Sequence, residues 1–221
     1  MIGIEFVASD DLQADIDVLK EFGEYIKYDF IIVPDNPLGS PSPSSLLCAK
    51  ILQDHLKIPV YPCLSGRGKS RENVISWLKG AKYGGIEGIA CVSGDGEEWG
   101  CGVEEILEEA KGFKEIITTS KSWKSKQSLG ATKAIHQPFF LLPFVDLEEG
   151  IMPSFMPIFS QQTFFLLKEG KLDFLIPSEY KNSNNLMQSN QELFVEFLQK
   201  DFYLITLNLK KQMHFFKELV R

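Results

Sequence analysis

Carboxylates and amides stand within or just after the short apolar runs of this chain. Glu5 lies inside the first run, between Ile4 and Phe6. Apolar surroundings favour the protonated form of a carboxyl group, which a general acid working near neutral pH requires. Pairing with a lysine, or solvation at the rim of a sheet, explains the same residue equally well. The polar residues at the ends of successive runs are Glu5, Asp35, Cys63, Asp95, Gln137 and Asn208, and they contain no Ser-His-Asp set.

Two glycine-containing segments follow apolar runs, and each has two interpretations. Ser93-Gly94-Asp95-Gly96 follows the run that ends at Val92. Its glycines permit a ligand to approach the backbone, and Asp95 would accept hydrogen bonds from a heterocycle or stabilise a cation. From the residues alone, a simple turn is favoured. Gly66-Arg67-Gly68-Lys69-Ser70 resembles a phosphate loop, but Cys63 stands where that motif needs glycine, so we expect a capped helix with basic loop residues.

Apolar runs alternate with helical patterns along the whole chain. Repeated strand-then-helix units predict a parallel sheet covered by helices. Eight predicted strands predict a compact α/β fold, a (β/α)₈ TIM-type barrel, in one domain over residues 1–221. The polar stretch 120–130 is too short for a full crossover helix, so the unit around 115–130 is expected to be eroded. The predicted strands are 2–7, 29–33, 58–64, 88–92, 115–118, 132–136, 151–158 and 202–207.

Composition and charge exclude several classes of protein. The chain has 221 residues, 44% hydrophobic, and a formal net charge of -7, which predicts no nucleic-acid or anionic membrane partner. No apolar run approaches the roughly 20 residues of a membrane span. Four cysteines without a C-x-x-C pair or nearby histidines predict no metal site and indicate free thiols in the cytoplasm. His136 is expected to be a hydrogen-bonded core or rim residue.

Five segments, in order along the chain, resemble the methylenetetrahydrofolate reductase family. The densest similarity covers 70–95, and a second covers 130–140, which reads GATKAIHQPFF. Shorter similarities are at 3–6, 150–153 and 206–208. The resemblance implies a (β/α)₈ barrel that binds FAD and, in one-carbon metabolism, reduces 5,10-methylenetetrahydrofolate to 5-methyltetrahydrofolate with NAD(P)H. The family commonly forms homo-oligomers, and the same is implied here.

The resemblance also implies roles for individual residues. Glu5 would protonate folate N10 and open the imidazolidine ring. Asp95 would hold the pterin and stabilise the iminium cation, and Gln137 would hydrogen-bond the pterin. Phe159 corresponds, through a loose alignment, to an aromatic that stacks on the substrate. The residues on the cofactor side would be Asp35, Cys63, Leu64, Ser65, Val92, Ser93 and Gly94.

Departures from the family concentrate on the flavin side. Pro34 replaces a threonine, Cys63 replaces a histidine, and Ile205 replaces a tyrosine. The segment that grips FAD in the family is missing, and 116–130 takes its place. These changes predict a folate pocket with weak FAD binding or none, in which NAD(P)H reduces the iminium carbon directly. The alternatives are a non-catalytic folate-binding or partner-binding barrel and an unrelated small α/β enzyme.

Overall fold

Nine parallel strands form one sheet in the computed structural model, in the order β7-β6-β5-β4-β3-β2-β1-β9-β8. The structure describes residues 1–37, 40–94, 99–136, 147–163, 180, 185–206 and 208–219. The strands are β1 (Ile2–Phe6), β2 (Phe30–Val33), β3 (Val60–Ser65), β4 (Gly88–Val92), β5 (Glu115–Thr119), β6 (Lys133–Ile135), β7 (Ile151–Met152), β8 (Ser154–Phe155) and β9 (Phe202–Thr206).

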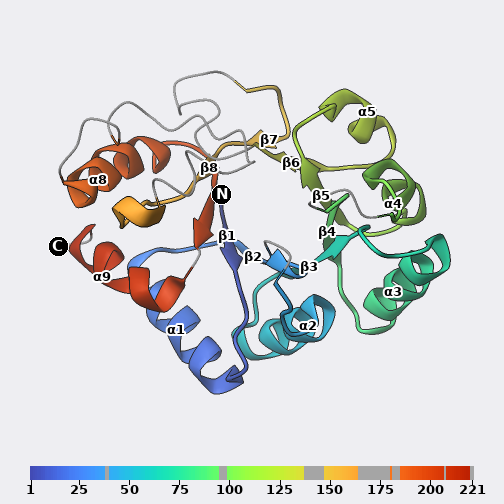
Figure 1. Cartoon of the computed structure of the whole chain (residues 1–221), viewed down its shortest axis with the longest axis horizontal. Helices are drawn as coiled ribbons and strands as arrows, with labels where there is room; N and C mark the ends of the chain where they lie inside the picture. Colours follow the sequence, from blue (N-terminus) through green and yellow to red (C-terminus); the bar gives the residue numbers. More distant parts are fainter. Residues whose placement is uncertain are drawn as a thin grey trace.

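The two ends of this sheet are joined by a single stretch of chain around Pro153. β7 pairs with β6, while β8, which begins directly after the proline, pairs with β9. The Pro153 carbonyl accepts a hydrogen bond from the Tyr203 N–H at 2.8 Å. The sheet therefore closes into a barrel (Figure 1). The predicted (β/α)₈ barrel is confirmed, and the predicted strand 151–158 divides because proline has no N–H for a continuous ladder.

Helices surround the barrel in chain order (Figure 1). They are α1 (Leu12–Tyr25), α2 (Ser45–Leu56), α3 (Arg71–Tyr83), α4 (Val103–Glu109), α5 (Trp123–Ser128), α8 (Leu186–Phe197) and α9 (Leu209–Leu219). Ser70 caps α3 by accepting from the Asn73 N–H at 3.4 Å, as expected for the basic loop. α5 has six residues, so the eroded unit retains a short helix. None of the described helices combines the length and apolar character needed to cross a membrane.

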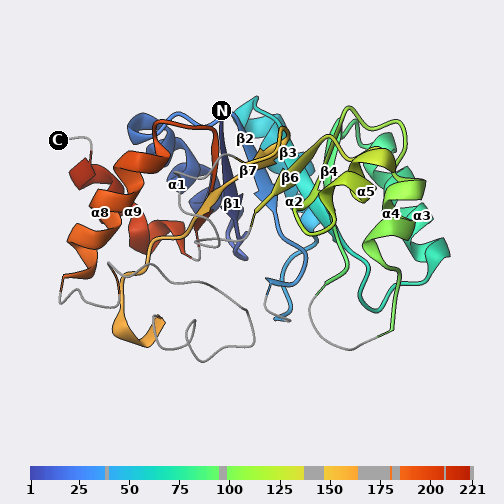
Figure 2. The ribbon, with the colours of Figure 1, turned by 90° about the horizontal axis from the view of Figure 1, so that it is seen from above.

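Alternate strand residues face opposite sides of the barrel wall. Residues facing outward pack under α1, α2, α8 and α9 on one side and under α3, α4 and α5 on the other. Residues facing inward form a separate interior cluster of Phe30, Ile32, Tyr61, Cys63, Ala90, Ile117, Met152 and Tyr203. In Figure 2 the chain after β2 (35–37 and 40–43) and the chain after β8 (156–163) project on the same side of the barrel, the side of the strands' C-terminal ends. We call this side the mouth.

Candidate functional site

Glu5 lies in the C-terminal half of β1 and faces the barrel interior. Its register partners are Ile32 of β2 and Ile205 of β9. The Tyr203 phenol donates to Glu5 Oε2 over 3.5 Å, and no lysine of the described residues pairs with this carboxylate. Burial raises the pKa of Glu5 to about 7, although the phenol lowers it. The side chain keeps partial exposure, so Glu5 is an acid that exchanges its proton near neutral pH.

An aromatic layer lies directly beneath Glu5. The Phe30 ring is 5.6 Å from that of Tyr61 and 6.4 Å from that of Tyr203. Phe30 occupies this space because residue 3 is glycine: a Cβ there would lie 2.2 Å from Phe30 Cζ. These side chains fill the barrel below the carboxyl group. The aromatic layer therefore closes the interior on the side of the carboxyl group that faces away from the mouth.

Cys63 is buried in the interior on β3. Burial raises the pKa of its thiol to about 12; the Asp35 N–H lowers it, and the carboxylates of Asp35 and Glu5 raise it further. The thiol is therefore neutral at physiological pH and does not compete with Glu5 for its proton. The expectation of free thiols is confirmed, since all four cysteines are unpaired. The described residues contain no cluster of His, Cys, Asp and Glu suited to a metal.

Asp35, after β2, is engaged with the loop that follows β3. Its Oδ2 accepts from Lys69 Nζ at 2.8 Å and from the Ser65 N–H at 3.3 Å. Ser65 Oγ in turn accepts from the Arg67 N–H at 3.3 Å. These contacts hold the loops after β2 and β3 together at the mouth.

The residues at the end of β4 also take part in contacts within the protein. Ser93 Oγ accepts from the Val103 N–H at 3.1 Å, at the start of α4. Gly94 has φ +93, and a Cβ there would lie 2.4 Å from Ser65 Oγ. Val92 lies against the interior cluster, whereas Leu64 is fully buried in the outer cluster under α3 and α4.

Of the seven predicted cofactor-side residues, Cys63 belongs to the interior cluster and Val92 packs against it, and alternation along β3 places Ser65 on the same face as Cys63. The polar members Asp35, Ser65 and Ser93 are bonded to neighbouring loops and to a helix start. Three of the positions that the family uses on its flavin side therefore already take part in contacts within the protein.

The other predicted residues are not all gathered around Glu5. Asp95 and Gln137 lie outside the described residues. Phe159 packs edge-on against Phe215 of α9, with ring centroids 5.3 Å apart, in the outer cluster. His136 Nδ1 lies 2.6 Å from Ser120 Oγ, and burial lowers the pKa of the imidazole. His136 is therefore the hydrogen-bonded rim residue that the sequence predicts.

Tyr203 is the site residue that the sequence analysis missed. It contacts Glu5 from a position 198 residues away in the chain. Two signals were available: alternation in β9 places Tyr203 and Ile205 on one face, and a closed barrel pairs its first strand with its last.

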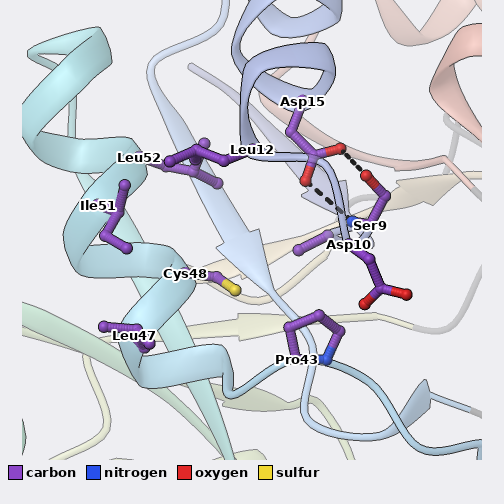
Figure 3. A pocket seen from close by; sticks show the side chains of 10 residues that line it. Ser9, Asp10, Leu12, Asp15, Pro43, Leu47, Cys48, Ile51 and Leu52 are labelled. Carbon is purple, nitrogen blue, oxygen red and sulfur yellow. Dashed lines mark hydrogen bonds between the residues drawn. The ribbon is translucent and has the colours of Figure 1, made fainter.

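A groove outside the barrel is separate from this site. It has a volume of about 250 Å³ and lies between α1 and α2 (Figure 3). Its walls are mostly apolar, and its buried carboxylate, Asp15, accepts from the Ser9 N–H at 2.9 Å and from Ser9 Oγ at 2.7 Å. Neither Glu5 nor any predicted site residue lines this groove.

No protein-family model matches the chain, and no curated protein matches it significantly. Several solved structures share its fold. A Clostridium thermocellum protein described as binding two copies of 5-methyl-5,6,7,8-tetrahydrofolic acid has a TM-score of 0.66 at 11% identity, covering 100% of this chain and 93% of that one. Orotidine 5'-monophosphate decarboxylase from Methanocaldococcus jannaschii has a TM-score of 0.55 at 11% identity, covering 100% and 98%. A phosphonopyruvate hydrolase has 0.55 at 10% identity, covering 99% and 80%. At these identities the comparisons establish the barrel fold.

Proposed function

We propose that this chain binds a reduced folate in the barrel mouth and reduces 5,10-methylenetetrahydrofolate to 5-methyltetrahydrofolate. The observation that carries the proposal is Glu5, a partly exposed interior carboxyl whose pKa is raised to about 7 by burial. Ring opening of this substrate needs a proton donor that is still protonated near neutral pH. The folate-binding neighbour, whose fold matches across the whole chain, supports the same ligand class.

The proposed reaction has two steps. Glu5 gives its proton to N10, the bond between N10 and the bridging carbon breaks, and the electron pair remains on N10. The bridging carbon is then a methylene iminium on N5. A hydride from a reduced nicotinamide adds to this carbon, giving the N5-methyl group and the oxidised nicotinamide. Glu5 regains its proton from water, because its pKa lies near neutrality.

We assign the hydride to NAD(P)H as a co-substrate rather than to a resident flavin. The side chains of Asp35, Ser65 and Ser93 already accept hydrogen bonds from the Ser65, Arg67 and Val103 N–H groups, which supports this assignment. The family role of Asp95, stabilisation of the iminium, stays part of this proposal and awaits its own test.

A second candidate is a folate-binding barrel without redox chemistry. The neighbour's description, which gives binding alone, favours it. Glu5 separates the two candidates, since binding by itself needs no acid with a raised pKa.

The first experiment follows NAD(P)H oxidation by purified protein supplied with methylenetetrahydrofolate, with and without added FAD. Binding of 5-methyltetrahydrofolate is measured in parallel by calorimetry. Turnover without FAD supports the reductase proposal, and turnover that strictly requires FAD contradicts the direct hydride step. Folate binding without turnover establishes the second candidate. Absence of both rejects both.

A further inference from the structure

We propose that Tyr203 is the positioning residue for Glu5. Its phenol holds Oε2, so that the acidic proton resides on Oε1, the oxygen left for the ligand. That the proton is transferred to a folate rests on the proposed function, whereas the pairing of Tyr203 with Glu5 does not.

The barrel fixes this phenol in place. Tyr203 is opposite Gly3 in the register between β9 and β1, two residues below Glu5, so its ring reaches along the strand to the carboxyl group. The ring is 2% exposed and stacks on Phe30 with planes 19° apart. A tyrosine has few rotatable bonds, and packing on this scale leaves its hydroxyl little freedom.

A tyrosine suits this position because it donates a hydrogen bond without giving up its proton. Burial, followed by the electrostatic effect of Glu5, raises the pKa of Tyr203 well above 10. A lysine there would instead keep Glu5 ionised and remove it as an acid. The phenol can donate to an oxygen that has a lone pair available, so the proton of the acid is directed to the other oxygen.

The neighbouring titratable groups are few. Cys63 faces Glu5 from β3, and its thiol stays protonated. Asp35, beyond Cys63, is paired with Lys69. Among the described groups Glu5 is therefore the interior acid that exchanges near neutrality. The 3.5 Å separation from Tyr203 Oη is long, as is common for catalytic hydrogen bonds before a ligand binds.

The decisive experiment titrates Glu5 in the ligand-free full-length protein by infrared difference spectroscopy of its carboxyl C=O band. Glu5→Gln identifies the band. Tyr203→Phe is expected to move the midpoint upward by about one pH unit, because a bond that favours the ionised form is lost. Tyr61→Phe is the matched control: it removes a hydroxyl from the same aromatic layer, but Tyr61 interacts with Glu115 and Glu87 instead, and the midpoint should stay.

An unchanged midpoint in Tyr203→Phe, or an equal shift in both variants, overturns the proposal. If Tyr203→Phe does not fold, biosynthetic replacement of tyrosine by 3-fluorotyrosine supplies the opposite test. The more acidic phenol donates more strongly and should move the Glu5 midpoint downward; no movement would contradict the pairing.

Turnover separates this inference from the proposed function. In an active enzyme, Tyr203→Phe should lower kcat about three- to tenfold while KM for the folate stays within about twofold. The alkaline limb of the pH profile should move upward with the spectroscopic midpoint. A shifted midpoint in a protein that turns over no folate rejects the function and keeps the pairing. Turnover of the folate with an unshifted midpoint in Tyr203→Phe supports the proposed function and rejects the pairing.

Discussion

Two glutamates face the same barrel interior from opposite ends, and their partners differ. Near the mouth, Glu5 has one long hydrogen bond from a phenol. At the other end, Glu115 begins β5 and its Oε2 lies 2.6 Å from Lys133 Nζ, with a further bond of 2.8 Å from Thr132 Oγ1. Glu115 therefore has a cation beside it, while Glu5 has none among the described residues. The comparison teaches that two glutamates in one barrel interior can have different surroundings: Glu5 is desolvated beside a phenol, whereas Glu115 has an ammonium and a hydroxyl as partners.

The largest expected effect is on turnover. Glu5→Gln should lower kcat by about two to four orders of magnitude and leave folate affinity within about twofold, because the amide keeps the shape but donates no proton. Steady-state assays and calorimetry measure the two quantities. Glu115→Gln is the matched control and should retain most of the activity. Equal losses in both variants would remove the distinction between the two ends.

The second effect is on stability as a function of pH. The pKa of Glu5 is about 7 when folded against an ordinary 4.5, so the folded state holds a proton that the unfolded state has lost between these values. The contribution of the protonated Glu5 to the free energy of unfolding is fully present below pH 4.5 and is lost as the pH rises through 7. Between pH 4.5 and 8, Glu5→Gln should gain about 2–3 kcal/mol relative to wild type. Urea unfolding at both pH values tests this; a constant difference would mean that Glu5 is not desolvated.

The aromatic layer beneath Glu5 supplies a third test. Gly3→Ala would place a methyl group 2.2 Å from Phe30 Cζ, and overpacking of this kind costs about 1–3 kcal/mol. Gly23→Ala, within α1, is the control, because its Cβ would meet the Tyr28 side chain beyond the end of that helix at an ordinary 3.5 Å. That variant should be neutral or stabilising by up to about 1 kcal/mol. Thermal unfolding compares the two, and a neutral Gly3→Ala would show that Phe30 is free to move.

The smallest effect is expected at the other end of the barrel. Lys133→Met should cost about 1 kcal/mol by leaving Glu115 without its ammonium, since both side chains are only about a quarter exposed (23% and 25%). The double variant Lys133→Met/Glu115→Gln should recover much of this loss. Urea unfolding of the four proteins gives the coupling energy. A coupling near zero would make this pair no different from a surface contact.

The eight predicted strands were recoverable from sequence because buried parallel strands consist of short apolar runs. The serine cap of α3 at Ser70 was recoverable for a similarly local reason. The division at Pro153 was not predicted, although proline signals it locally. Leu64 could also have been placed: it follows Cys63 directly in β3, and neighbouring strand residues face opposite sides, so both cannot line the interior.

Long-range pairings were not recoverable in the same way. Asp35 was predicted to lie at a strand end, but its bond to Lys69 depends on how two loops meet. Phe159 was predicted to stack on a substrate, and in the structure it packs against Phe215 instead. An aromatic side chain packs well both in a protein core and against a flat ligand, so the residue type alone does not predict which of the two Phe159 contacts.

The sequence by itself determined the order of strands and helices and the unusual position of Glu5 in an apolar run. Those features depend on neighbours within a few residues, and local periodicity records them. Only the tertiary structure decided that Glu5 meets Tyr203 and, within the described part of the chain, no lysine. That outcome requires the closure of β1 on β9, a contact between residues 198 positions apart. The chemistry of the acid thus follows from the geometry of barrel closure.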